Sequence, residues 1–375
     1  MPWWLAAPAW IIWAVTAGAF LSSGLREKLF MHKTFALVKK TLPPISQTEQ
    51  EALDAGDVWW EGDLFRGTPD WDKLLAMPKP ALRADEQAFL DNQVTTLCRM
   101  LDDWKIVQEE RDLPAEVWEY IRNQGFFGLV IDKQYGGLGF SALAHSTIVS
   151  RIASRSLSAA VNVMVPNSLG PAELIYHYGT NEQRDYYLPR LAKGIEVPCF
   201  GLTASEAGSD AGAIPDTGVI CRGTYEGKEI IGMRLNFDKR YITLAPMATI
   251  IGVAFKLYDP EHLLGTKTDL GVTLALVPAS HPNVQSDTRH FPMNLAFLNG
   301  PVRGKDVFLP LDDIIGGPAM AGHGWRMLME CLSIGRSISL PALSHAVGAV
   351  SYRMTGAYAR IRKQFKLPIA HFEGV

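Results

Sequence analysis

The spacing of the hydrophobic residues changes twice along this chain, and that change constrains the fold more than any other feature. Between Asp85 and Lys193 apolar residues recur at helical intervals. One such stripe consists of Phe89, Val94, Leu97, Leu101 and Trp104. After Pro198 the interval shortens to that of strands, and from Gly324 to about Phe365 it is helical again. A parallel α/β fold would alternate helix and strand, so we expect an α+β protein.

The helical stretches and the β block define the expected domains. Helices are predicted at 85–104, from Asp112 to about Gly125, at 141–165 and at 170–193. Residues 225–231 are typical of a hairpin, and further strands are predicted at 240–243, 249–257, 272–277 and 306–309. Many short strands with Gly and Pro between them favour a small barrel or sandwich. We therefore predict an N-terminal helical domain at 83–197, a β-barrel domain at 198–317, and helices of a third domain at 318–375.

Composition narrows the functional class. Of 375 residues, 47% are hydrophobic and 20% charged, so the chain can bury a sizeable core and is not disordered. A formal net charge of −3 argues against a nucleic-acid-binding protein, because such proteins usually carry a basic stripe on their surface. The cysteines lie far apart without a CxxC pair, which argues against a disulfide framework or a metal site: Cys98, Cys199, Cys221 and Cys331.

The amino terminus carries no charged side chain between Pro2 and Leu25. About 24 residues form a helix of about 36 Å, enough to cross a hydrocarbon core of about 30 Å. Trp3 and Trp4 suit an aromatic belt, whereas Pro8 weakens a straight span, so a span at 1–25, an interfacial anchor and a signal segment all stay open. The basic residues that follow at once, within the stretch 26–82, predict that the main body lies on the cytoplasmic face of the membrane: Arg26, Lys28, Lys33, Lys39 and Lys40. The rest of that stretch, residues 41–82, is rich in Pro, Trp and acid and is expected to be a linker that packs on the surface of the main body.

Two segments carry hydroxyl and aromatic side chains that suit a polar ring system. In the loop at 198–210, Gly208 lets the backbone approach a ligand, and Thr203, Ser205 and Ser209 supply hydroxyls. In the segment 239–245, alternation places Tyr241 and Thr243 on one face of a strand, where a ring can stack and a hydroxyl can bond its edge. Taken alone, the first segment is more typical of an ordinary Ser/Gly loop and the second of an ordinary half-buried strand.

The segments 322–336 and 362–373 complete a set of motifs. Arg362 is a natural phosphate ligand, although a solvated helix charge explains it as well. Together the motifs resemble, in order and spacing, those of the acyl-CoA dehydrogenase family from about Leu113 to the last residue. The matching stretches are Tyr135–Gly139 for the family's Y-G-G turn, Phe200–Asp210 for T-E-P-x-A-G-S-D, Arg240–Thr243 for W-I-T, and Arg362–Phe365 for R-x-Q-F-G. This chain departs from those motifs at Ala204, Ser205, Tyr241 and Lys366.

The resemblance implies FAD as cofactor and assigns residues to it. Flavin contacts are implied for Phe200, Leu202, Thr203, Ser209, Tyr241 and Thr243. Contacts to the acyl-CoA are implied for Ser209, Ser333 and Arg336, with Ser333 standing where Asp is frequent in the family. Arg362, Gln364 and Phe365 would reach the FAD of a neighbouring subunit, so the family pattern implies a homo-oligomer, a dimer or tetramer.

The activity implied is α,β-dehydrogenation of a fatty acyl-CoA to the trans-2-enoyl-CoA, with electrons passed to an electron-transferring flavoprotein. The hydrophobic amino terminus and the long tryptophan-bearing segment after it resemble those of the large membrane-associated bacterial enzymes that catalyse the first step of fatty acid β-oxidation. Two alternatives stay open: a flavin-dependent acyl-CoA oxidase or monooxygenase on the same fold, and a flavin-free, membrane-tethered acyl-CoA-binding protein.

The resemblance implies no catalytic base within this sequence. Most family members place a Glu roughly a hundred residues after the R-x-Q-F motif, which here would lie beyond Val375, so we expect a fragment truncated at its carboxyl end. A minority place it just before the arginine that corresponds to Arg336, where this chain has Gly335. Glu330 lies nearly two helical turns from Arg336 and should point elsewhere, and Glu206 and Glu373 belong to cofactor-facing motifs.

Overall fold

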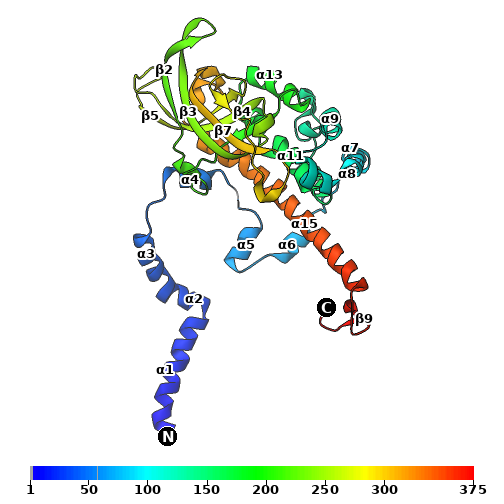
Figure 1. Cartoon of the computed structure of the whole chain (residues 1–375). Coiled ribbons are helices and arrows are strands. Elements are labelled where there is room, and N and C mark those ends of the chain that lie inside the picture. Colours follow the sequence, from blue (N-terminus) through cyan, green and yellow to red (C-terminus); the bar gives the residue numbers. More distant parts are fainter. Residues whose placement is uncertain (1–2, 57) are drawn as a thin grey trace. The chain divides into compact units, whose positions relative to one another are not determined.

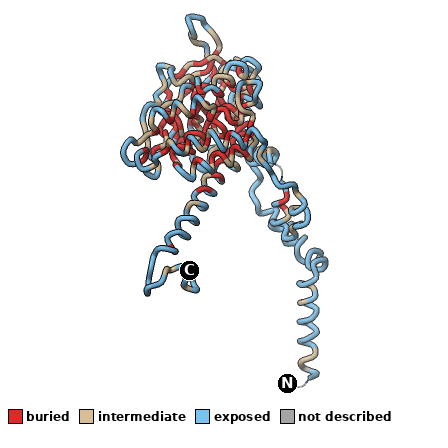
Figure 2. Tube along the Cα trace, turned by 90° about the vertical axis from the view of Figure 1, so that its right-hand side faces the viewer, coloured by how far each residue is buried: buried red, intermediate tan, exposed pale blue. Residues whose placement is uncertain are grey.

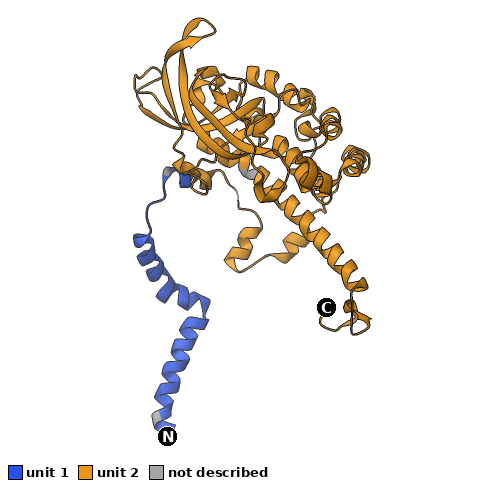
Figure 3. Cartoon of the chain, in the orientation of Figure 1, with its two compact units in different colours: residues 1–50 blue, residues 51–375 orange. Residues whose placement is uncertain are grey.

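The computed structural model describes residues 3–56 and 58–375, except for the side chains of Leu5, Gln47, Ser333 and Ile334. The chain divides into two compact units, residues 1–50 and residues 51–375 (Figure 3). Each unit is described below by itself.

The first unit is a series of helices with exposed apolar side chains. Its elements are α1 (Trp3–Leu21), α2 (Ser23–Arg26), a π-helical turn (Glu27–Met31), α3 (His32–Thr41) and the start of α4 (Gln47–Asp54). Within the described part, no single helix is long and apolar enough to cross a membrane. The segments Ala6–Leu21 and Ser23–Thr41 together are long and apolar enough to cross a membrane, but the pair is bent by 87° at the break between them. The three interpretations of residues 1–25 therefore stay open.

The second unit begins with short helices where we predicted only a surface linker. They are α5 (Glu61–Arg66) and α6 (Trp71–Leu75). Asp70 caps α6 by accepting a hydrogen bond from the Lys73 N–H at 2.9 Å. The Trp60 indole donates to the Asp70 carbonyl at 2.7 Å and lies 5.2 Å from the Trp71 ring, so this segment holds a small apolar contact of its own.

The predicted helical domain is present, with more helices than the sequence pattern indicated. It contains α7 (Ala84–Phe89), α8 (Thr95–Met100), α9 (Ala115–Asn123), α10 (Ala142–Ala153), α11 (Leu157–Ser168), α12 (Pro171–Tyr178) and α13 (Asn181–Ala192), with π-helical turns at Leu90–Val94 and Lys105–Glu110. The predictions of single helices at 141–165 and 170–193 were wrong. Ser156 and Thr180 each cap a new helix, Thr180 in a capping box with Gln183, and these caps divide each stretch in two.

The β block forms one curled seven-stranded sheet. Its strands are β1 (Pro198–Gly201), β2 (Thr217–Tyr225), β3 (Lys228–Thr243), β4 (Ile250–Tyr258), β5 (Asp269–Pro278), β6 (Val284–Gln285) and β7 (Asn299–Pro310). The order is β1-β4-β2-β3-β7-β6, and β5 pairs with β4. The predicted hairpin is β2–β3, closed by Glu226 and Gly227, which both have positive φ as a tight hairpin turn requires.

The chain then returns to helix, as predicted. α14 (Gly324–Met327) leads through a π-helical turn (Leu328–Leu332) into α15 (Ser333–Ile361), and a small hairpin of β8 (Lys363–Gln364) and β9 (Leu367–Pro368) follows. The first half of α15 packs on α10 and α11, while its carboxyl half is exposed (Figure 2). Helices α7–α13 gather on one side of the sheet, and the main core joins their apolar side chains to those of the strands (Figure 1). The predicted α+β architecture is confirmed.

Two helices in this unit touch through a glycine. A Cβ atom added at Gly335 of α15 would lie 2.0 Å from the Ser168 carbonyl oxygen at the end of α11. Real Cβ atoms do not approach that closely, so the spacing of α11 and α15 depends on a residue without a side chain.

Candidate active site

A cavity of about 210 Å³ lies where β1, β3, α11 and α15 meet. Six of the predicted site residues line it: Phe200, Leu202, Thr203, Tyr241, Thr243 and Arg336. Further apolar residues of its wall are Val165 of α11, Leu169 directly after α11, and Leu332 at the end of the π-helical turn before α15. Residues from three separate motifs are thus brought together, although their individual roles stay predictions.

A bulge in β3 shapes one wall of this cavity. Lys239 pairs with Val302 of β7, but Ile242 pairs with Gly300, so two residues of β3 lie in an irregular stretch between those pairs. One of them, Tyr241, has a φ of 58°, which is unusual for a residue with a side chain. Bulges re-aim side chains and are frequent beside functional sites. Here the bulge places both Tyr241 and Thr243 on the cavity wall.

The loop that carries Thr203 is held against β3 by a buried ion pair that sequence reasoning missed. Lys239 is fully buried, and its Nζ donates to the Leu202 carbonyl at 3.0 Å and to the Asp216 carboxylate. Burial lowers the pKa of Lys239, and Asp216 acts in the opposite direction. The Arg240 N–H also donates to the Thr203 carbonyl at 3.1 Å, so the loop and the bulged strand form one rigid wall.

The other predicted site residues lie elsewhere. Ser209 is exposed in the loop after β1 and does not line the cavity, and the Ser333 side chain lies outside the described part. Arg362 caps the far end of α15, with Gln364 and the exposed Phe365 in the hairpin beyond it. The 26 residues from Arg336 to Arg362 span about 39 Å of helix. One chain therefore does not bring these two groups of residues to the same ligand.

A second cavity, of about 310 Å³, lies between α10, α12 and α15. Its lining includes His145, Glu173, Tyr176 and Gly335. His145 is buried, and within the described part its Nε2 has no hydrogen-bond partner. Burial lowers its pKa to about 4, so this imidazole is neutral at pH 7.

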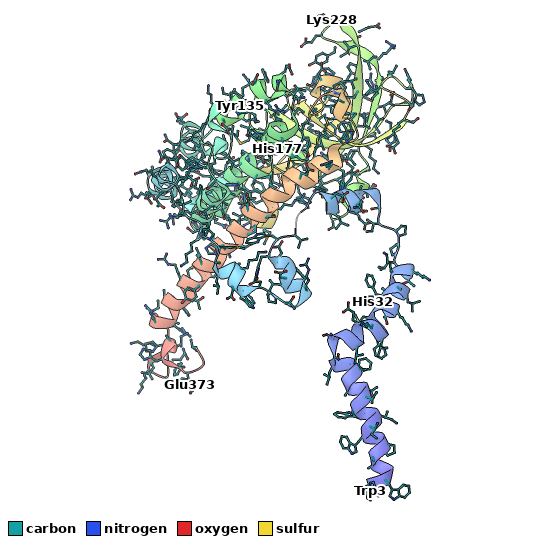
Figure 4. The ribbon with its side chains drawn as sticks, turned by 180° about the vertical axis from the view of Figure 1, so that it is seen from behind. Trp3, His32, Tyr135, His177, Lys228 and Glu373 are labelled. Atoms are coloured by element: carbon teal, nitrogen blue, oxygen red, sulfur yellow. The ribbon has the colours of Figure 1, made fainter. Side chains whose placement is uncertain are left out.

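The glutamates considered as a base are engaged or distant. Glu330 accepts hydrogen bonds from the Tyr178 hydroxyl and, at 2.7 Å, from Arg326 Nε. Glu206 is exposed. Glu373 lies in the segment after α15, far from Tyr135 and His177 (Figure 4). We assign no catalytic base among the described residues.

The smaller cavity fits one end of a flat heterocycle. Apolar walls suit the faces of a ring, the hydroxyls of Thr203 and Thr243 can bond its polar edge, and the Arg336 guanidinium supplies a positive charge. The volume suits a ring rather than a whole dinucleotide. The donor set therefore agrees with the flavin contacts that the motifs imply.

Comparison with known proteins points the same way. Residues 79–195 match the family model described as acyl-CoA dehydrogenase, N-terminal domain. Protein HemX of Proteus mirabilis is 59% identical over 91 residues, covering 24% of this chain and 54% of that protein. The 3-(aryl)acrylate reductase of Clostridium sporogenes is 32% identical over 272 residues, covering 72% of this chain and 67% of the reductase.

Solved structures share the fold. Butyryl-CoA dehydrogenase from Megasphaera elsdenii superposes with a TM-score of 0.67 at 21% identity, covering 79% of this chain and 74% of that one. An acyl-CoA dehydrogenase complexed with FAD from Bacillus anthracis has a TM-score of 0.65 at 22% identity, covering 77% and 46%. The chain spans about half to two thirds of the length of the curated relatives it matches. From its sequence relatives and its fold together, the chain belongs to the acyl-CoA dehydrogenase family.

Proposed function

We propose that this protein is an FAD-dependent dehydrogenase that converts fatty acyl-CoA to trans-2-enoyl-CoA, the first oxidative step of β-oxidation. The observation that carries the proposal is that one cavity, of about 210 Å³, is lined by residues of the loop at 198–210, the bulged strand β3 and α15. When bound, FAD supplies the acceptor for the hydride that leaves the β-carbon. The solved relative complexed with FAD supports the choice of cofactor.

In that reaction, the residues of this chain would bind the flavin ring and the acyl-CoA and orient them. Thr203 and Thr243 would bond the polar edge of the ring, and Tyr241 would pack beside it. Val165, Leu169 and Leu332 would keep water from the reacting carbons, which strengthens each hydrogen bond to the substrate. Arg336 would attract the anionic part of the acyl-CoA.

Partners and location belong to the same proposal. An electron-transferring flavoprotein would take the electrons, and a second copy of the chain would bring Arg362, Gln364 and Phe365 to the FAD. The distance along α15 supports the second copy, because one chain does not bring Arg362 to its own cavity. We also propose that residues 1–25 attach the protein to the cytoplasmic face of the inner membrane of a bacterium.

A second candidate is the reverse reaction, reduction of an α,β-unsaturated acyl group. It is favoured by the similarity to the Clostridium relative, a 3-(aryl)acrylate reductase. Both reactions use one flavin site. Anaerobic addition of a fatty acyl-CoA should bleach the bound flavin if the protein is a dehydrogenase, and slow reoxidation in air would exclude an oxidase. No bleaching by acyl-CoA, with rapid oxidation of reduced flavin by an enoyl-CoA, would favour the reductase.

Flavin occupancy tests the assignment of the cavity. Thr203→Ala in the full-length protein should lower the FAD that copurifies several-fold, because it removes a hydroxyl on the cavity wall. Thr266→Ala is the matched control, since Thr266 is an exposed threonine in the loop between β4 and β5 and its substitution should leave occupancy unchanged. Arg362→Ala should also lower occupancy if a second copy completes the site. Undiminished FAD in the Thr203 and Arg362 variants would refute these assignments, and a colourless wild-type protein that does not take up FAD would refute the function.

A further inference from the structure

Asn299 holds the bulged stretch of β3 from the neighbouring strand. It lies at the start of β7 and is almost fully buried, with 3% of its surface exposed. Its Nδ2 donates to the Tyr241 carbonyl at 3.0 Å and to the Thr243 Oγ1 at 3.3 Å. One amide group thus bonds two of the three residues through which β3 contributes to the smaller cavity.

The orientation of this amide is determined by what it meets. The Tyr241 carbonyl only accepts hydrogen bonds, so the NH₂ end of Asn299 must face it. The other end, Oδ1, is buried and has no hydrogen-bond partner within the described part. Leaving the buried Oδ1 acceptor unpaired costs free energy, yet the side chain still directs its NH₂ group at the Tyr241 carbonyl.

That orientation limits what the Thr243 hydroxyl can do. A threonine hydroxyl has one proton to donate and two lone pairs to accept with. Because Asn299 donates to Oγ1, one lone pair is occupied and the proton is left for another acceptor. Thr243 lines the cavity, so a molecule bound there would be the acceptor on that side.

The same contact stabilises an unusual backbone. Tyr241 has its φ at 58°, and the Asn299 bond to its carbonyl is formed inside the irregular stretch where regular pairing with β7 is interrupted. Strained backbone persists only where surrounding contacts determine it, and such positions cluster at functional sites.

We propose that Asn299 is a positioning residue that makes Thr243 a hydrogen-bond donor to the polar edge of the bound flavin. This inference rests on the proposed function, because it requires FAD in the smaller cavity. Asn299 touches no ligand itself in this arrangement. It acts through the Thr243 hydroxyl and through the bulge that presents it.

The test compares FAD affinity in single and double variants of the full-length protein. Asn299→Asp keeps the shape but removes the donor, and Thr243→Val removes the hydroxyl. Each should weaken FAD binding to the apoprotein about tenfold, as expected for one hydrogen bond in a buried site. If Asn299 acts through Thr243, then Asn299→Asp in the Thr243→Val background should weaken binding by less than about threefold, since the two changes remove one coupled interaction.

Controls separate this role from a structural one. Asn236→Asp is the matched substitution on the same pair of strands, where Asn236 accepts from the Asp306 N–H and should have no effect on flavin. The visible absorption band of the bound flavin should shift in the same way in Asn299→Asp and Thr243→Val and be restored by Thr243→Ser. Should Asn299→Asp not fold, as judged by the melting of the apoprotein, the smaller Asn299→Ser replaces it.

Three results would overturn the inference. The first is an FAD affinity in the Asn299 variants equal to that of the wild type. The second is that the effects of Asn299→Asp and Thr243→Val on FAD affinity multiply fully in the double variant. The third is that the flavin spectra of these two single variants differ from each other. Failure of the wild-type apoprotein to bind FAD is a different result, because it would overturn the proposed function itself.

Discussion

At the scale of single residues, His145 links the second cavity to the acid stability of the protein. Its pKa of about 4 in the folded chain lies below its usual value of 6.5, because burial disfavours the charged imidazole. The unfolded chain therefore binds the proton more readily between these values. Stability from this group is complete above pH 6.5 and is lost as the pH falls towards 4.

We predict that His145→Gln reduces this acid sensitivity. The difference between the two pKa values corresponds to about 3 kcal/mol, so the wild-type loss in unfolding free energy between pH 7 and pH 4 should shrink by up to that amount. Urea unfolding at both pH values measures the change. His345→Gln, at an exposed position of α15, is the control. An equal loss in wild type and in His145→Gln would contradict the prediction.

Residue patterns located the cavity but not the contacts that build it. Thr203, Tyr241 and Thr243 could be selected from the sequence because hydroxyls and an aromatic at strand spacing suit a ring. Lys239 and Asp216, 23 residues apart, could not be paired, because nothing in their local sequence states that two charges will be buried together. No pattern in the local sequence marks Asn299 as a site residue, since its hydrogen-bond partners lie on another strand.

At the scale of elements, periodicity predicted the order of helices and strands better than their ends. The division of 141–165 and 170–193 into four helices was missed because Ser156 and Thr180 were treated as helix interior rather than as caps. The bulge in β3 was missed because it depends on how β3 registers with β7, which is a tertiary property.

The contact between α11 and α15 gives a prediction at this scale. Gly335→Ala should destabilise the protein by about 1–3 kcal/mol, because the new Cβ would meet the Ser168 carbonyl oxygen and force the helices apart. Gly348→Ala is the matched control in the same helix, with nothing within 4 Å of an added Cβ. It should stabilise the protein by about 0.5–1 kcal/mol through helix propensity. Thermal melting of both variants measures this, and similar shifts would disprove the close contact.

At the scale of the whole molecule, periodicity predicted the order of domains and four motifs indicated the family, while attachment to a membrane rests on residues 1–25 alone. Deleting these residues should move the protein from the membrane fraction towards the soluble fraction without changing its flavin spectrum. The basic residues that follow can hold some protein on anionic lipid, so a high-salt wash belongs in the fractionation. Membrane association that resists both the deletion and the salt would show that residues 1–25 are not the main anchor.

The glycine at 335 also bears on how this enzyme can evolve. Because the family resemblance implies a base at this position in a minority of members, a single codon change at 335 would be the shortest relocation of a base to α15. In this chain the Ser168 carbonyl oxygen occupies the space that any side chain at 335 would need. Relocation would first require substitutions that re-space α11 and α15, each of which would be selected only for its own effect. Backbone packing therefore keeps a carboxylate out of position 335, and a change at 335 alone cannot place one there.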